Sequence, residues 1–136
     1  MIDADSIPPV DDDEWLARFI VHSNEFRNDD SVNPKLFLPY KRVVLSVNRH
    51  RGCSEKEIWK VGSDVAQSRK CTLYGRADIK ASSCRIGPLD VVPNPLLPTN
   101  PNHADITGFP STKEDQQALA LKLAGAASKR LSVPSH

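Results

Sequence analysis

The sequence has few cysteines, and their arrangement excludes a common class of small proteins. The 136 residues include three cysteines, Cys53, Cys71 and Cys84, and no CxxC pair. An odd number without paired spacing is not a disulfide framework, and the cysteine and histidine spacings match no zinc-binding pattern. We therefore expect reduced thiols that behave as small apolar side chains, with no metal and no other cofactor.

Long apolar runs are also missing. A transmembrane helix needs roughly eighteen apolar residues in a row, and no such run occurs. The first ten residues contain Asp3, Asp5, Pro8 and Pro9 and no basic residue. A secretory signal begins with basic residues followed by an apolar run, so we expect a cytoplasmic protein without membrane association.

Apolar and aromatic residues are modest in number but sufficient for one core. They make up 39% and 6% of the chain, beside 26% charged residues. These values are typical of one soluble domain. We expect a single α+β domain over residues 11–131, preceded by a flexible acidic tail over residues 1–10 and followed by a flexible tail over residues 132–136.

What the sequence does contain is charge sorted by position. The first thirty residues hold nine acids and two bases, whereas residues 32–86 hold twelve bases and four acids. The balance thus changes from −7 to +8 inside a chain whose net charge is +1. Two explanations follow: the acidic segment folds onto the basic elements, or the basic middle meets an anionic partner.

The apolar pattern predicts helices and strands in alternation. Trp15, Leu16, Phe19 and Ile20 recur at helical spacing after a run of aspartates, which suits a helix N-terminus. Four prolines between Pro93 and Pro101 predict an ordered loop without regular structure. We expect helices over residues 13–22, 54–68 and 112–130, and strands over residues 42–48, 71–80, 83–86, 89–92 and 103–109.

Two capping boxes mark where helices begin. Ser54 is followed three residues later by Glu57, and Ser111 by Glu114. Gly62, inside the second predicted helix, indicates close backbone packing. The order of elements predicts an α+β fold: a small antiparallel or mixed sheet with about three helices packed on one face, the last helix being C-terminal.

A basic segment lies between the strongest strand and a capped helix. Arg49, His50 and Arg51 precede the helix start at Ser54, where free backbone N–H groups favour anions. Together with Arg76 they are our candidates for anion or partner binding. A protein-facing surface, an anion or nucleotide site and a solvated loop all remain open interpretations.

His103 and Asp105 are the candidate catalytic residues. Two positions apart on an extended strand, they share one face of it. If Cys53 or Cys84 lay nearby, the three side chains could act as nucleophile, base and orienting carboxylate. Alternatively, His103 hydrogen-bonds a loop carbonyl or Asp105 and stiffens the proline-rich segment.

The absence of catalytic motifs and the sorted charge favour a small non-catalytic cytoplasmic protein. It would act by protein–protein interaction, as an accessory, regulatory or immunity-type subunit. One alternative is a hydrolase or transferase with an anionic substrate near Arg49, His50, His103 and Asp105. Another is a nucleic-acid-binding protein that uses the basic middle segment, although no zinc finger, helix-turn-helix spacing or aromatic stacking set is present.

Overall fold

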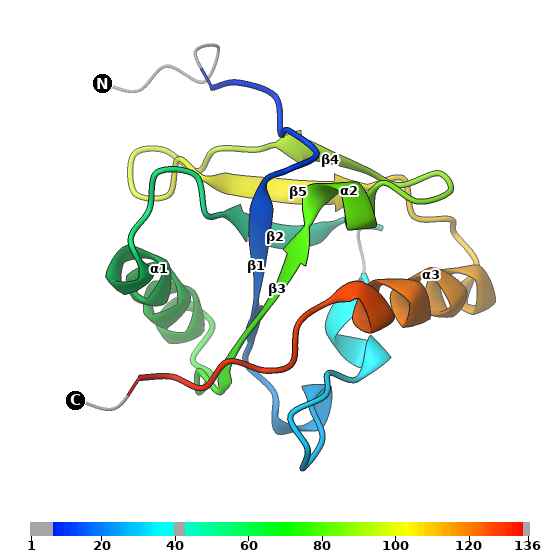
Figure 1. Ribbon diagram of the computed structural model, residues 1–136, viewed down its shortest axis with the longest axis horizontal. Coiled ribbons are helices and arrows are strands. Elements are labelled where there is room, and N and C mark those ends of the chain that lie inside the picture. The colour runs from blue at the N-terminus through cyan, green and yellow to red at the C-terminus, as the bar shows by residue number, and fades with distance from the viewer. Residues whose placement is uncertain (1–6, 40–42, 135–136) are drawn as a thin grey trace.

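The computed structural model describes residues 7–39 and 43–134. At its centre is a five-stranded antiparallel sheet with the strand order β3-β1-β2-β5-β4 (Figure 1). Its strands are β1 (Trp15–Ile20), β2 (Leu45–Arg49), β3 (Gly75–Lys80), β4 (Asp90–Pro93) and β5 (His103–Thr107). The α-helices are α1 (Glu55–Ser68), α2 (Ala81–Cys84) and α3 (Lys113–Ala126). Two short 3-10 helices are η2 (Ser23–Glu25) and η3 (Pro34–Phe37). The predicted α+β fold with a C-terminal last helix is confirmed.

β1 replaces the helix predicted over residues 13–22, so that prediction was wrong. It pairs with β3 along its whole length, from Trp15 opposite Lys80 to Ile20 opposite Gly75. Leu16 and Ile20 lie in the main core, while Ala17 and Phe19 pack on the other side. A strand buried on both faces lacks apolar–polar alternation, and its apolar residues can imitate a helical stripe.

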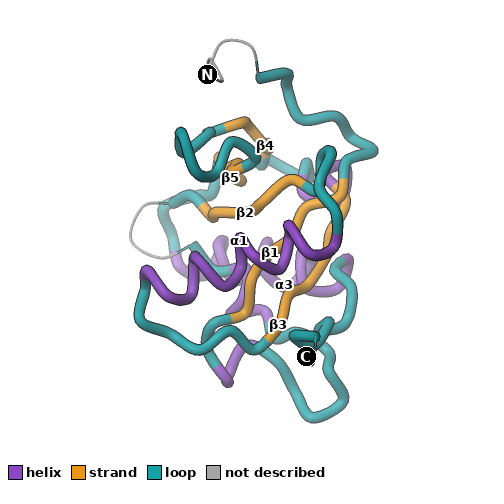
Figure 2. The backbone as a smooth tube through the Cα atoms, turned by 90° about the vertical axis from the view of Figure 1, so that its left-hand side faces the viewer, coloured by secondary structure: helices purple, strands orange, loops and turns teal. Residues whose placement is uncertain are grey.

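The helices lie on both faces of the sheet, not on one as we predicted. α3 and η3 cover the face of the main core, to which Leu16, Val47 and Leu123 belong. α1 crosses the opposite face, where Ile58 meets Phe19 (Figure 2). β2 and β3 run parallel to each other with β1 antiparallel between them, and α1 connects them.

α1 begins and packs as the sequence predicts. Ser54 Oγ accepts from the Glu57 backbone N–H at 3.2 Å, and Glu57 Oε1 accepts from the Ser54 N–H at 3.1 Å. These two bonds confirm the capping box. A Cβ atom at Gly62 would lie 2.6 Å from Phe19 Cε1. The close packing inferred from Gly62 is therefore confirmed.

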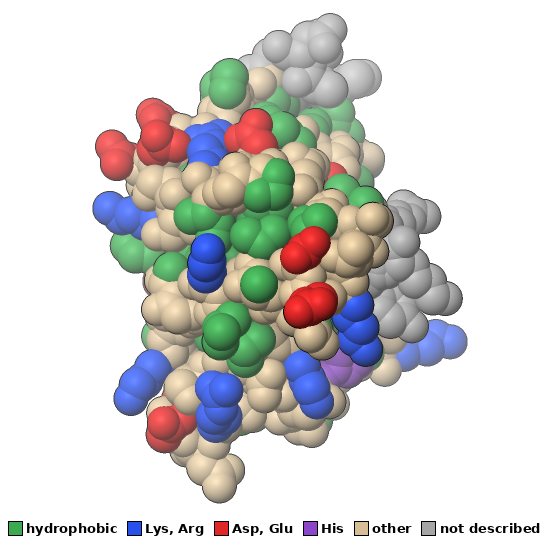
Figure 3. Space-filling model, turned by 90° about the vertical axis from the view of Figure 1, so that its right-hand side faces the viewer, with side chains coloured by type: hydrophobic (Ala, Val, Ile, Leu, Met, Phe, Trp, Pro, Cys, Tyr) green, Lys and Arg blue, Asp and Glu red, His purple; other side chains and the backbone are tan. Residues whose placement is uncertain are grey.

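Other boundaries differ from the predictions. Residues 83–86 contain the end of α2 and two residues without regular structure, instead of a strand. α3 is capped by Thr112, not Ser111, and it ends at Ala126 instead of near residue 130. The residues beyond Ala126 run beside β3. On the side of the molecule opposite α1, acidic and basic side chains of the described residues lie around apolar ones (Figure 3).

Both edges of the sheet are closed in the described part of the chain. Along β3, the Arg76 N–H donates to the Leu131 carbonyl at 3.0 Å, and the Leu131 N–H donates back at 2.8 Å. Along β4, Arg85 donates to the Val91 carbonyl at 3.1 Å, and Asp90 Oδ1 accepts from the Val91 N–H at 2.8 Å. Neither edge invites pairing with another strand.

Residues 8–10, the end of the tail predicted over residues 1–10, contact the folded domain. Val10 is buried, and the Pro8 and Pro9 carbonyls accept hydrogen bonds from Arg49. Residues 1–6 lie outside the described residues. None of the described helices is long and apolar enough to cross a membrane.

Candidate functional site

Arg49, the first predicted ligand-binding residue, is buried and fully engaged within the protein. Its Nε and Nη2 donate to the two carboxylate oxygens of Glu14, each at 2.7 Å, and its Nη1 donates to the Pro8 carbonyl at 2.9 Å. Burial raises the pKa of Glu14, but the hydrogen bonds and charge of Arg49 outweigh it, and the pKa is lowered overall. The Arg49 guanidinium therefore has a structural role within the protein.

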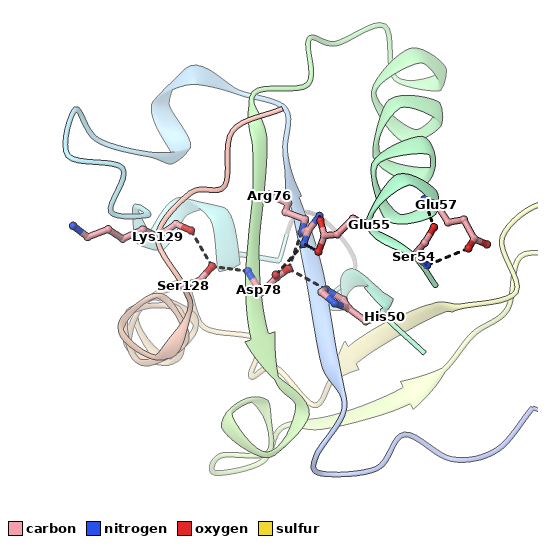
Figure 4. Close-up of polar contacts among 8 residues, drawn as sticks. All are labelled: His50, Ser54, Glu55, Glu57, Arg76, Asp78, Ser128 and Lys129. Carbon is pink, nitrogen blue, oxygen red and sulfur yellow. Dashed lines mark hydrogen bonds and ion pairs between the residues drawn. The ribbon is translucent and has the colours of Figure 1, made fainter. Parts of the chain in front are cut away.

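His50 and Arg76 meet at a second internal cluster, which we call the Asp78 cluster (His50, Glu55, Arg76 and Asp78; Figure 4). His50 Nε2 lies 3.0 Å from Asp78 Oδ1, and Arg76 Nε donates to the same oxygen at 3.0 Å. Arg76 also donates to both Glu55 oxygens at 2.9 and 3.0 Å. Ser128 Oγ accepts from the Asp78 backbone N–H at 2.9 Å, so the cluster joins β3, α1 and the C-terminal segment.

The charges in the Asp78 cluster stabilise one another. Burial raises the pKa of Asp78, yet the hydrogen bonds from His50 and Arg76 outweigh it and lower the pKa. Burial disfavours the charged Arg76, but Glu55 and Asp78 raise its pKa overall. The Arg76 guanidinium also lies 4.8 Å from the centre of the Trp59 ring, which adds a cation–π contact.

Arg51 differs from the other three predicted ligand-binding residues. It is exposed, and its side chain makes no ion pair with the described residues. It lies at the entrance of a hollow beside the N-terminal end of α1. The structure therefore brings His50 and Arg76 together, buries Arg49 elsewhere, and leaves Arg51 available to a ligand.

His103 and Asp105 share one face of β5 as predicted, but both are bound to Asn94. His103 Nδ1 lies 2.9 Å from the Asn94 carbonyl oxygen, and Asp105 Oδ2 accepts from Asn94 Nδ2 at 2.8 Å. Because a carbonyl oxygen only accepts, Nδ1 carries the proton. This is the loop-stiffening arrangement that the sequence left open, since Asn94 starts the proline-rich loop.

The structure does not assemble a thiol triad from the described residues. Cys84 lies in the main core, where burial raises the pKa of its thiol to about 12. Cys53 Sγ accepts from Asn102 Nδ2 at 3.1 Å, and no hydrogen bond joins it to His103. Within residues 7–39 and 43–134, no group of His, Cys, Asp and Glu side chains is arranged to hold a metal ion.

A groove lies between α1 and the proline-rich loop. It consists of two adjoining hollows, of about 330 and 400 Å³, that share Phe19, Asn48 and Asn100. Asn48 Nδ2 donates to Asn100 Oδ1 at 2.7 Å and forms the floor between them. We call this feature the α1 groove; the first hollow adjoins the start of α1 and the second adjoins its end.

Sequence reasoning missed the α1 groove because its floor joins distant residues. Asn48 and Asn100 are separated by 52 positions, and neither carries a motif. The available indication was indirect: Asn48 follows an apolar strand, and Asn100 lies in a proline-rich loop that must be ordered. Those features predict polar residues at strand ends, but they do not predict that Asn48 and Asn100 contact each other.

Comparison with known proteins gives no relative for this chain. No family model matches it, and no curated protein or solved structure does so either. The geometry of the α1 groove and the charges around it are therefore the basis for proposing a function.

Proposed function

We propose that this chain is a small non-catalytic binding protein that holds an extended segment of a partner protein in the α1 groove. Such a protein would serve as an accessory, regulatory or immunity-type subunit. The observation that carries the proposal is the pair of adjoining hollows on either side of the Asn48–Asn100 pair. An elongated groove with an apolar and amide-bearing floor suits a peptide chain.

The residues that line the α1 groove suit a bound peptide better than they suit the flat surface of a folded partner. Phe19, Val61 and Leu96 offer apolar contacts, and Asn100, whose amide pairs with that of Asn48, has a second N–H that can donate to a peptide backbone. Strand addition, the other common way to bind an extended segment, is disfavoured because both sheet edges are already covered. The groove is thus the best candidate surface.

The two alternative functions have less support. Catalysis by His103 and Asp105 would need them to act on each other or on a thiol, whereas both bind Asn94. Nucleic-acid binding would need many free bases, whereas Arg49, Arg76 and Arg85 are held in ion pairs. Exposed bases such as Arg51 keep the second alternative open to test.

Site-specific photo-crosslinking in the native cell tests the proposal. A photo-reactive phenylalanine analogue replaces Thr99, an exposed residue of the groove, and in a control chain it replaces Leu121, which is 63% exposed on α3. We expect one discrete protein adduct from position 99 that Val61→Asp abolishes, and no such adduct from position 121. Adducts of equal yield from both positions, or none from position 99, would contradict the proposal. A salt-sensitive nucleic-acid adduct from position 99 would instead favour the nucleic-acid alternative.

A further inference from the structure

The second hollow of the α1 groove is unusually basic. Arg18, Arg69 and His103 line it, and its described lining residues include no aspartate or glutamate. Elsewhere in the described structure, the buried arginines Arg49 and Arg76 face carboxylates. A hollow with two guanidiniums and no acid lacks the counter-charge that the rest of the protein supplies.

Arg18 is one of the two arginines that line this hollow. The pairing between β1 and β2 ends at Ala17 opposite Asn48, and Arg18 lies just beyond. Its Nε donates to the Leu36 carbonyl at 2.9 Å and its Nη1 to the Ser46 carbonyl at 3.0 Å. It makes no ion pair with any described residue. Two neutral acceptors hold the guanidinium in place but leave its charge unbalanced.

The surroundings of Arg18 confirm this imbalance. Burial lowers the pKa of Arg18 to about 10; the charge of Glu25 opposes this effect and that of Arg69 adds to it. Glu25 does not line the hollow, and its Oε1 accepts from the Val21 and His22 backbone N–H groups. An anion beside Arg18 and Arg69 would balance both guanidiniums.

We propose that the second hollow binds an oxyanion, either a carboxylate or a phosphate, carried by the partner segment in the α1 groove. Arg18 and Arg69 supply the charge. Asn100 supplies an amide, and Val65 and Leu96 provide apolar walls for the group that carries the oxyanion. His103 also lines the hollow, but its ring proton is donated to the Asn94 carbonyl, so the two arginines and Asn100 are the donors that we assign to the oxyanion. The inference rests on the proposed function, since it specifies what the bound segment carries.

NMR titration of the ¹⁵N-labelled full chain tests this site with two probes, inorganic phosphate and phenyl phosphate. We expect saturable shifts near Arg69 and His103 and a dissociation constant for phenyl phosphate on the order of 1 mM. Arg69→Gln should weaken binding about tenfold, because it removes a charge-assisted contact with the ligand from a residue that makes no ion pair with the described residues. Lys56→Gln is the matched control: it removes one exposed charge from the same helix, outside the hollow.

The outcomes separate the sources of the oxyanion. Tighter binding of phenyl phosphate than of inorganic phosphate, with shifts at Val65 and Leu96, supports an oxyanion carried by a larger group. Equal affinity for phenyl phosphate and inorganic phosphate would show that the site binds a free oxyanion. That result would overturn the proposal that the partner segment carries the oxyanion. Absence of saturable shifts, or equal losses in Arg69→Gln and Lys56→Gln, would overturn the site itself.

The failure of this inference can be told apart from failure of the proposed function. If the crosslink from position 99 keeps its full yield in Arg69→Gln, the groove binds its partner without an oxyanion, and only this inference falls. If phosphate binds but no protein crosslinks from position 99, the oxyanion site is supported and the proposed binding of a partner protein is contradicted.

Discussion

At the scale of single residues, arginines connect parts of the chain that are distant in sequence. Arg49 binds Glu14 across 35 positions, and Arg130 binds Asp30 across 100. The Arg49–Glu14 and Arg85–Asp12 pairs join acids of the first segment to bases of residues 32–86, so the two segments partly neutralise each other. Such contacts also explain why Arg49 and Arg76 were assigned to a ligand: local sequence shows a basic residue but not its distant partner.

The Asp78 cluster yields the prediction at this scale. Asp78→Asn should lower the free energy of unfolding by about 2 kcal/mol, because a buried arginine loses an ionic partner while Glu55 retains its two bonds. Asp64→Asn is the control, since Asp64 forms an exposed helical pair with Lys60, and it should cost less than about 0.5 kcal/mol. Urea unfolding measures both values.

The same variant should change the dependence of stability on pH. The pKa of Asp78 is lowered in the folded protein, so its contribution is present above the ordinary aspartate value of about 3.9 and is lost as the pH falls through the lower, folded value. Unfolding free energies should therefore decline below about pH 4 in the wild type and less steeply in Asp78→Asn. Parallel curves for the two proteins would contradict this role.

At the scale of elements, the sequence predicts best where local chemistry is decisive. Ser54 and Glu57 define the start of α1 through bonds within four residues. By contrast, β1 was misread because its environment is tertiary: α1 covers Phe19 and the main core covers Leu16. The α1 groove could not be predicted, since its floor depends on the pairing of β2 with β5.

The packing of α1 on β1 gives the prediction at this scale. Gly62→Ala should destabilise the protein by about 1 kcal/mol, because a Cβ atom 2.6 and 2.7 Å from Phe19 ring atoms must displace the ring, and this cost exceeds the gain in helix propensity. Gly125→Ala is the matched control in α3, where nothing lies within 4 Å. It should stabilise by about 0.5 kcal/mol. Thermal unfolding of both variants would reveal effects of opposite sign, and a stabilised Gly62→Ala would contradict the packing argument.

At the scale of the whole molecule, segments outside the sheet complete it. The C-terminal segment from Ser128 to Leu131 continues the hydrogen bonding of β3. Gly75 allows this approach, because its φ of +145° suits glycine and a Cβ atom would clash with the Leu131 carbonyl oxygen. Arg130 fixes the same segment to Asp30 and to the Tyr74 carbonyl. An edge strand is thus covered by a short piece of chain.

Removal of this cover should expose β3. A chain that ends at Ala127 loses the two Arg76–Leu131 bonds and the Ser128 N–H bond to the Asp78 carbonyl. These three bonds alone contribute about 2 to 3 kcal/mol of unfolding free energy, at about 1 kcal/mol per bond. The chain also loses the bonds of Ser128 Oγ to Asp78 and of Arg130 to Asp30 and Tyr74, so the total loss should be larger. The control chain ends at Ser132 and keeps these contacts, so its stability should equal that of the full chain.

The shorter chain should also associate with itself, because an uncovered edge strand presents unpaired backbone groups to a second copy. Sedimentation velocity at several concentrations measures this association, and urea unfolding measures the loss of stability. If the chain ending at Ala127 is as stable and as monomeric as the one ending at Ser132, the C-terminal segment does not protect the sheet. In that case β3 would become a second candidate surface for an extended partner, and the proposed function could no longer be confined to the α1 groove.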